Sequence, residues 1–154
     1  MTESVRLAKL TPDNIHAACD IRVEPEQERF VAPVVDSIAE AYVRPDTTWP
    51  RLILDGERVV GFVMGAFDPG NEVDAFRAGI WRLNIAAGEQ GRGYGRFAVN
   101  AVAEEARRRG HARITVLWER GEGGPEEFYL RLGFRPTGEE LSGEVVGELH
   151  LRAD

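Results

Sequence analysis

The sequence predicts a mixed α/β (α+β) fold, in which a central β-sheet of about six to seven strands is flanked by about four helices. Segments with strand-like alternation and segments with helical periodicity follow one another in the order β-α-α-β-β-β-α-β-α-β-β. Helices on the faces of a mixed sheet would bury the apolar side of each element. A chain of 154 residues, 43% of them hydrophobic, suits a single domain spanning residues 1–154.

The first third of the chain predicts a strand, two helices and a hairpin. Residues 5–10, VRLAKL, alternate like a half-buried strand, and residues 11–21 open with Thr and Pro, as helices often do. Apolar residues recur at helical spacing in residues 33–43. Residues 51–67 hold two β-rich runs around an Asp-Gly pair, which predicts an antiparallel hairpin.

The remainder alternates strands with helices. A strand that is buried over much of its length is expected at residues 75–87, and an apolar stripe predicts a helix from Tyr94 to Arg109. Further elements follow in short segments: a strand at residues 112–118, a helix at 125–132, and a final pair of strands at 134–138 and 143–151.

Composition narrows the classes of partner. A formal net charge of −7 disfavours nucleic acid, whose phosphates need Lys and Arg, and favours a cationic small molecule, although acids also simply keep a domain soluble. The apolar runs are far shorter than the roughly 20 residues of a membrane span, so we expect a cytoplasmic protein that does not bind membranes. Cys19 is the only cysteine and the three histidines lie far apart, which predicts no metal site.

A glycine-rich segment at residues 84–100 predicts either a phosphate-binding loop or a tight turn, because four glycines fall within eight positions just before a helix. GYGRFA fits the dinucleotide pattern G-x-G-x-x-A, with Glu119 as the ribose-binding acid. That motif normally opens a βαβ array, whereas this segment follows an antiparallel hairpin. The P-loop is excluded because no Gly-Lys-Ser/Thr follows.

The segment QGRGYG resembles the Q/R-x-x-G-x-G/A pyrophosphate loop of the GNAT superfamily of acetyl-CoA-dependent N-acetyltransferases. The resemblance implies a GNAT-like mixed sheet, acetyl-CoA as cosubstrate and no metal. It also implies that backbone amides bind the pyrophosphate, and that amides near Ile85 hold the thioester oxygen where two strands splay apart. The coenzyme A site then comprises Leu83, Asn84, Ile85, Gln90, Gly91, Arg92, Gly93, Tyr94, Gly95, Arg96 and Phe128.

Six segments between Phe30 and Leu151 are similar, in the same order, to segments of the spermine/spermidine (polyamine) acetyltransferases: FVAPVVDSIAEAY, VVGFVMGAFDP, WRLNI, QGRGYG, FYLRLGF and TGEELSGEVV. This resemblance implies a primary-amine acceptor such as a polyamine. The alternatives are an amino acid, antibiotic or peptide amine, or a non-catalytic coenzyme A-binding sensor. A homodimer is one option for the assembly. Four residues depart from the usual pattern, Asn84, Ala86, Glu122 and Pro125.

Acetyl transfer needs a group that accepts a proton and a group that donates one. An alkylamine with a pKa of about 10 must lose a proton before it attacks. The candidate bases are Glu119, after the strand at residues 112–118, and Glu139, Glu140 and Glu144 near the C-terminal strands. Glu119 is the expected base unless it is an ordinary surface acid. Tyr129 matches the superfamily tyrosine that protonates the coenzyme A thiolate, although a tyrosine there can also serve packing. The expected acceptor-binding residues are Phe30, Tyr42, Trp81, Glu139 and Glu144, with Asp36 and Glu140 nearby.

Overall fold

A seven-stranded sheet forms the centre of the computed structural model, which describes residues 4–152. The strand order is β1-β2-β3-β4-β5-β7-β6, and every neighbouring pair is antiparallel except β4 and β5, which are parallel. The strands are β1 (Val5–Ala8), β2 (Thr48–Asp55), β3 (Arg58–Phe67), β4 (Ala78–Ile85), β5 (Arg113–Trp118), β6 (Arg135–Leu141) and β7 (Glu144–His150). The mixed α/β architecture predicted from the sequence is confirmed.

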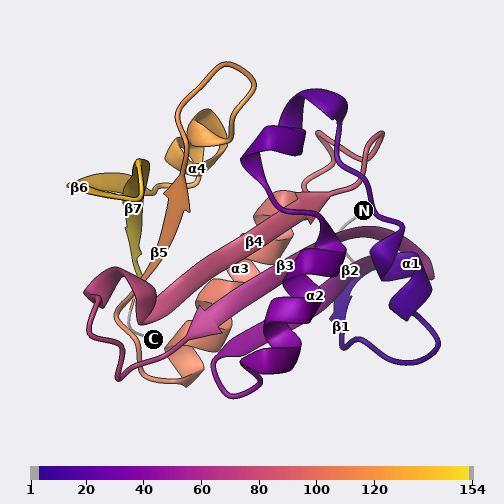
Figure 1. Ribbon diagram of the computed structural model, residues 1–154, viewed down its shortest axis with the longest axis horizontal. Helices are drawn as coiled ribbons and strands as arrows, with labels where there is room; N and C mark the ends of the chain where they lie inside the picture. Colours follow the sequence, from indigo (N-terminus) through magenta and orange to yellow (C-terminus); the bar gives the residue numbers. More distant parts are fainter. Residues whose placement is uncertain (1–3, 153–154) are drawn as a thin grey trace.

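Within the described residues, four α-helices flank the sheet: α1 (Ile15–Cys19), α2 (Val34–Val43), α3 (Tyr94–Arg108) and α4 (Glu126–Arg131). In Figure 1, α1 and α2 lie over one face of β2 and β3, and α3 runs behind the other face. The short helix α4 follows β5 and stands beside the upper part of that strand. The two faces of the sheet are therefore covered by different parts of the chain.

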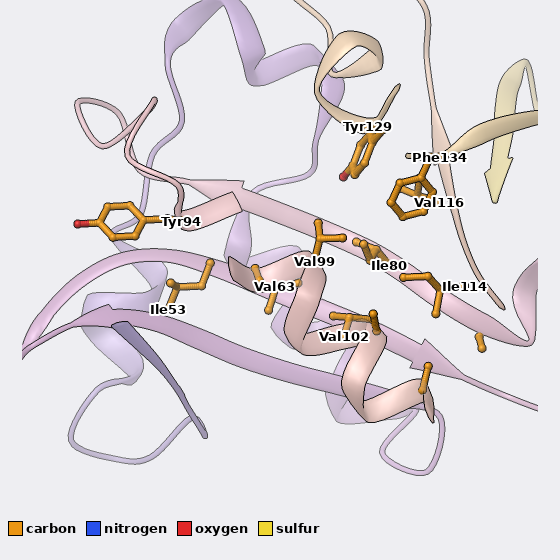
Figure 2. Close-up of a cluster of buried hydrophobic side chains, with 14 of the residues drawn as sticks. Ile53, Val63, Ile80, Tyr94, Val99, Val102, Ile114, Val116, Tyr129 and Phe134 are labelled. Atoms are coloured by element: carbon orange, nitrogen blue, oxygen red, sulfur yellow. The ribbon is translucent and has the colours of Figure 1, made fainter. Parts of the chain in front are cut away.

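Side-chain alternation in β2 and β3 explains why helices cover both faces. Ile53 and Val63 belong to the larger buried cluster, which α3 completes with Val99 and Val102 (Figure 2). Their strand neighbours point the other way and join a second cluster with α1 and α2: Leu52, Leu54, Phe62 and Met64. Successive side chains of a strand point to opposite faces, so a strand that is apolar throughout needs cover on both sides.

Between Pro25 and Phe76 the structure also holds two 3₁₀ segments that the sequence analysis did not predict, η2 (Pro25–Phe30) and η3 (Asp74–Phe76). Helix α1 is shorter than the expected 11–21 span, while β6 continues beyond the expected 134–138 segment to Leu141. Segment η2 has no buried residue, so it lacks the apolar periodicity from which a helix can be predicted.

Strands β4 and β5 pair over only two positions and then separate (Figure 1). Gly79 pairs with Thr115 and Ile80 with Val116, after which β4 continues beside β3 and β5 continues beside β7. A Cβ on Gly79 would lie 2.2 Å from the Thr115 carbonyl oxygen, so the closest approach of the strands requires glycine there. Beyond this point the sheet opens into a wedge.

Candidate active site

A cavity of about 620 Å³ fills the wedge between β4 and β5. Leu83 and Ile85 of β4 form one wall, Phe128 and Tyr129 of α4 form another, and the glycine loop before α3 closes one end. Apolar walls with a backbone-rich end suit an elongated ligand that carries phosphates at one end.

The glycine loop leaves its backbone open at the start of α3. Gly91 and Gly93 have φ values of 77° and 88°, a left-handed conformation that favours glycine, and a Cβ on either would meet no described atom within 4 Å. The Phe97 N–H donates to the Gly93 carbonyl at 3.0 Å, so the N–H groups of residues 94–96 precede the first helical hydrogen bond. These amides and the positive end of the helix fit a pyrophosphate.

Side-chain contacts tie the loop to its surroundings. The Gln90 amide donates to the Ile85 carbonyl at 3.0 Å and to Gln27 Oε1 at 3.2 Å. Glu89 forms ion pairs with Arg58 and, at 3.8 Å, with Arg92. The loop is therefore fixed to β4, to η2 and to the β2–β3 hairpin, while Arg96 lines the cavity with its exposed side chain.

Tyr129 is buried inside an aromatic cluster beside the cavity. Its ring stacks on Trp118 with centroids 5.6 Å apart, and Phe128 and Phe134 pack edge-on at 5.0 and 5.5 Å. Figure 2 shows Tyr129 beside Phe134, at the end of the buried cluster away from Tyr94. Burial raises the pKa of the Tyr129 hydroxyl, so the phenol stays protonated near neutral pH and is able to donate.

Two residues of the predicted coenzyme site direct their polar atoms elsewhere. The Tyr94 hydroxyl donates to Asp55 and lies 3.5 Å from Arg58, so only the remainder of Tyr94 faces the cavity. Asn84 is buried and its Nδ2 donates to the Ala32 carbonyl at 3.0 Å, while Leu83 and Ile85 on either side line the cavity. Asn84 thus anchors the chain before α2.

A second cavity, of about 1190 Å³, lies beside the first; we call it the acceptor cleft. Asp36, Arg82 and Glu144 are among its charged lining residues. Five residues line both cavities and so mark where they meet: Phe30, Val31, Ile80, Trp81 and Leu117. A ligand in each cavity would therefore reach the opening between β4 and β5.

Glu144 is the acidic residue with the most perturbed environment at this opening. It is half-buried, and burial followed by the nearby charge of Glu119 raises the pKa of its carboxyl, against the opposing charge of Arg82. The Glu119 side chain is 49% exposed, is paired with Arg29 at 3.1 Å and lines neither cavity. Of the two, Glu144 is placed better to accept a proton in the cleft.

The structure brings Phe30, Trp81 and Glu144 together in the cleft, but it leaves two of the predicted acceptor residues outside both cavities. Tyr42 is 85% exposed on α2, and Glu139 is exposed on β6, where it contacts Thr137. Arg82 was missed, because a charged residue in a strand gives no signal of its position until the strand's register is known.

The described part of the chain holds neither a cluster of metal ligands nor a membrane-spanning helix. Within residues 4–152, no three His, Cys, Asp or Glu side chains gather in a way that could hold a metal ion. None of the helices formed by these residues is both long and apolar enough to cross a membrane.

Several solved structures share the fold of this chain. The PaiA N-acetyltransferase of Thermoplasma acidophilum, solved with coenzyme A, superposes with a TM-score of 0.69 at 13% identity, covering 96% of this chain and 99% of its own. The ribosomal-protein-S18-alanine N-acetyltransferase of Escherichia coli superposes with a TM-score of 0.69 at 15% identity, covering 97% of this chain and 96% of its own. YncA of Salmonella typhimurium, solved with acetyl-CoA, superposes with a TM-score of 0.67 at 17% identity, covering 97% of this chain and 95% of its own.

These neighbours share the fold and do not single out the polyamine branch. No curated protein sequence matches the chain. The model of the acetyltransferase (GNAT) family, in contrast, matches residues 14–134, which is most of the sequence. With that match, and with a wedge-shaped sheet that ends at an open glycine loop, the chain belongs to the acetyltransferase (GNAT) family.

Proposed function

We propose that the protein transfers an acetyl group from acetyl-CoA to the primary amine of a small molecule, with both substrates bound at once. One observation carries the proposal: a cavity with an open glycine loop and a cleft with a perturbed carboxylate meet between β4 and β5. Acetyl-CoA supplies an acetyl group activated as a thioester. The protein's task is to align the amine with that group.

The residues of the first cavity would hold the coenzyme. The backbone amides from Gly93 to Arg96, which precede the first helical hydrogen bond of α3, would bind the pyrophosphate, and the exposed guanidinium of Arg92 would add positive charge at the same end. Leu83 and Ile85 offer an apolar wall to the pantetheine arm.

Two side chains would handle the protons. The acceptor amine is protonated near neutral pH, so Glu144 first accepts one proton from it, directly or through a water, and the neutral amine then attacks the acetyl carbon. The nitrogen loses its second proton to solvent as the intermediate collapses to the amide. Tyr129 donates a proton to sulfur as the carbon–sulfur bond breaks. Solvent then reprotonates Tyr129 and removes the proton from Glu144, which restores the starting state. Glu119 acts here through its charge, which helps raise the Glu144 pKa.

Polyamines are a second, narrower candidate for the acceptor. Acidic residues outnumber basic ones along the acceptor cleft: Glu28, Asp36, Asp46, Asp68 and Glu144 against Arg29, Arg44 and Arg82. Such a lining attracts cations over a Debye length of about 8 Å at physiological salt. A peptide amine is a further candidate, because one structural neighbour is by name a ribosomal-protein alanine acetyltransferase.

The proposed function is tested by measuring thiol release from acetyl-CoA with spermidine, amino acids and an alanine-ended peptide. Each is paired with a control in which methylation blocks the amine. We expect release that requires a free primary amine and follows saturation in both substrates. Tight coenzyme A binding with no amine-dependent release would instead support a non-catalytic sensor.

A further inference from the structure

Arg82 lies in the acceptor cleft, and the protein does not provide hydrogen-bond acceptors for all the N–H groups of its side chain. Its Nε is buried and has no hydrogen-bond partner among the described residues. Nη1 of the guanidinium donates a hydrogen bond to the carbonyl oxygen of the adjacent Trp81 at 3.3 Å. The Trp81 ring covers one face of the group, with its centroid 4.8 Å from Cζ.

The acidic residues near Arg82 do not form a direct ion pair with its guanidinium. Glu40, Glu144 and Asp36 act on its charge through space, but none of them forms an ion pair with it. Burial outweighs the three acids and lowers the pKa of Arg82. In contrast, Arg113 on β5, which is also partly buried, donates to Glu148 at 2.7 Å and pairs with Asp74.

A buried N–H group without an acceptor is costly, and an arginine presents its N–H groups in a planar fork that matches a carboxylate or a phosphate. We propose that Arg82 binds an oxyanion of the acceptor, so that the acceptor is a small amine that also carries a carboxylate or a phosphate. This inference rests on the proposed function and narrows its acceptor class.

The charges of the cleft fit such a zwitterionic molecule. Glu144 lines the same cleft and is close enough to Arg82 for each to shift the other's pKa. An acceptor held by its anion at Arg82 would present its amine toward the carboxylate of Glu144. This arrangement ranks amino-acid-like amines above polyamines, whose charged groups are all positive.

The experiment uses pairs of acceptors, one of which carries an anion that the other lacks, and compares them at pH values matched to the pKa of each amine. L-Amino acids are compared with their α-carboxamides, and phosphoethanolamine with ethanolamine, by thiol release from acetyl-CoA. We expect the anionic member of one series to have the higher kcat/KM in the wild type. Arg82→Gln should lower kcat/KM for that member by about 10- to 100-fold, as the loss of a charged hydrogen bond implies, and should spare the neutral member.

Two variants serve as controls. Arg44→Gln removes the same charge from an exposed residue of the same cleft and should leave the preference intact. Arg82→Lys keeps the charge without the fork and should fall between the wild type and Arg82→Gln. Unchanged coenzyme A affinity in each variant shows that the fold is retained. Equal rates for paired acceptors in the wild type, or equal losses in Arg82→Gln and Arg44→Gln, would overturn the inference.

A second measurement separates this inference from the proposed function. If no amine is acetylated, the proposed function fails, and the anion subsite is then tested by NMR. The Arg82 Nε–H signal is identified by its absence from the Arg82→Gln spectrum, and acetate and inorganic phosphate are added with chloride as the control. A saturable shift with either oxyanion supports the subsite. A signal that responds to neither, or equally to chloride, contradicts it.

Discussion

Phe128 lies against Gly95, so that a Cβ built on Gly95 would come within 2.9 Å of the ring's Cζ. Gly95 is in the first turn of α3, and Phe128 precedes Tyr129 in α4. The contact therefore joins the start of α3 to the helix that carries the proposed proton donor. Gly95 belongs to the predicted coenzyme site, but the space at its α-carbon is filled by an aromatic ring.

Gly95→Ala should therefore disturb α4 rather than the loop. The added methyl overpacks a filled contact, which typically costs about 1–3 kcal/mol of unfolding free energy. Thermal unfolding should show the loss, and kcat should fall because Tyr129 moves with Phe128. Adding Phe128→Leu should recover part of both losses, since it removes ring atoms from the contact. A Gly95→Ala protein with wild-type stability and kcat would show that the contact does not position α4.

Gly93→Ala should weaken coenzyme A binding. A side chain at a φ of 88° costs about 1–2 kcal/mol and also enters the open space where we place the pyrophosphate. Gly110→Ala is the matched control, because Gly110 has a φ of 87°, equally open surroundings, and a position at the opposite end of α3. Calorimetric titration should show weaker binding in Gly93→Ala alone. Equal affinities in the two variants would remove the loop from the coenzyme site.

Tyr129→Phe should lower kcat by about 100-fold or more, in the range of general acid catalysis, with little change in the KM for acetyl-CoA. The ring keeps its contacts with Trp118 and Phe134, and only the hydroxyl is lost. Because burial raises the Tyr129 pKa, this phenol is protonated throughout a neutral pH range, and its loss should not move the acidic limb of the rate profile. Retained kcat would assign thiolate protonation to water.

The acidic limb of kcat/KM should report Glu144. The base works as a carboxylate, so activity rises with pH through its pKa, which burial and then Glu119 raise above the ordinary value. Glu119→Gln removes a negative neighbour, lowers that pKa, and should move the limb to lower pH. Glu144→Gln should abolish the limb and most of the turnover. Glu139→Gln, an exposed site on β6, is the control and should change neither.

Local signals in the sequence predicted much of the fold. Two of these signals are the Asp-Gly pair of the β2–β3 hairpin and the apolar stripe of α3. Each signal lies within a short stretch of sequence, so these elements were predicted near their observed bounds. Segment η2 was missed because distant contacts help hold it: Gln27 accepts from Gln90, and the preceding Glu24 accepts from the Gly88 N–H at 2.8 Å.

The acceptor side depended most on information that one sequence lacks. The pairing of β3 with β4 shifts by one residue at Trp81, because Met64 pairs with Arg82 while Gly65 pairs with Ile80. Such a bulge changes the direction of later side chains, and it is defined only when the partner strand is known. The faces to which Trp81 and Arg82 turn therefore could not be read from the alternation of β4.

The transfer of acetyl-CoA's own acetyl group to an amine nitrogen is the most direct test of the account. The wild-type protein is incubated with acetyl-CoA carrying ¹³C in the acetyl group and with the acceptor series described above, and products are analysed by mass spectrometry. We predict that the label appears as an N-acetyl group on one amine series, in equal amount to the thiol released. Label recovered only as free acetate, or no thiol released while coenzyme A binds, would contradict it.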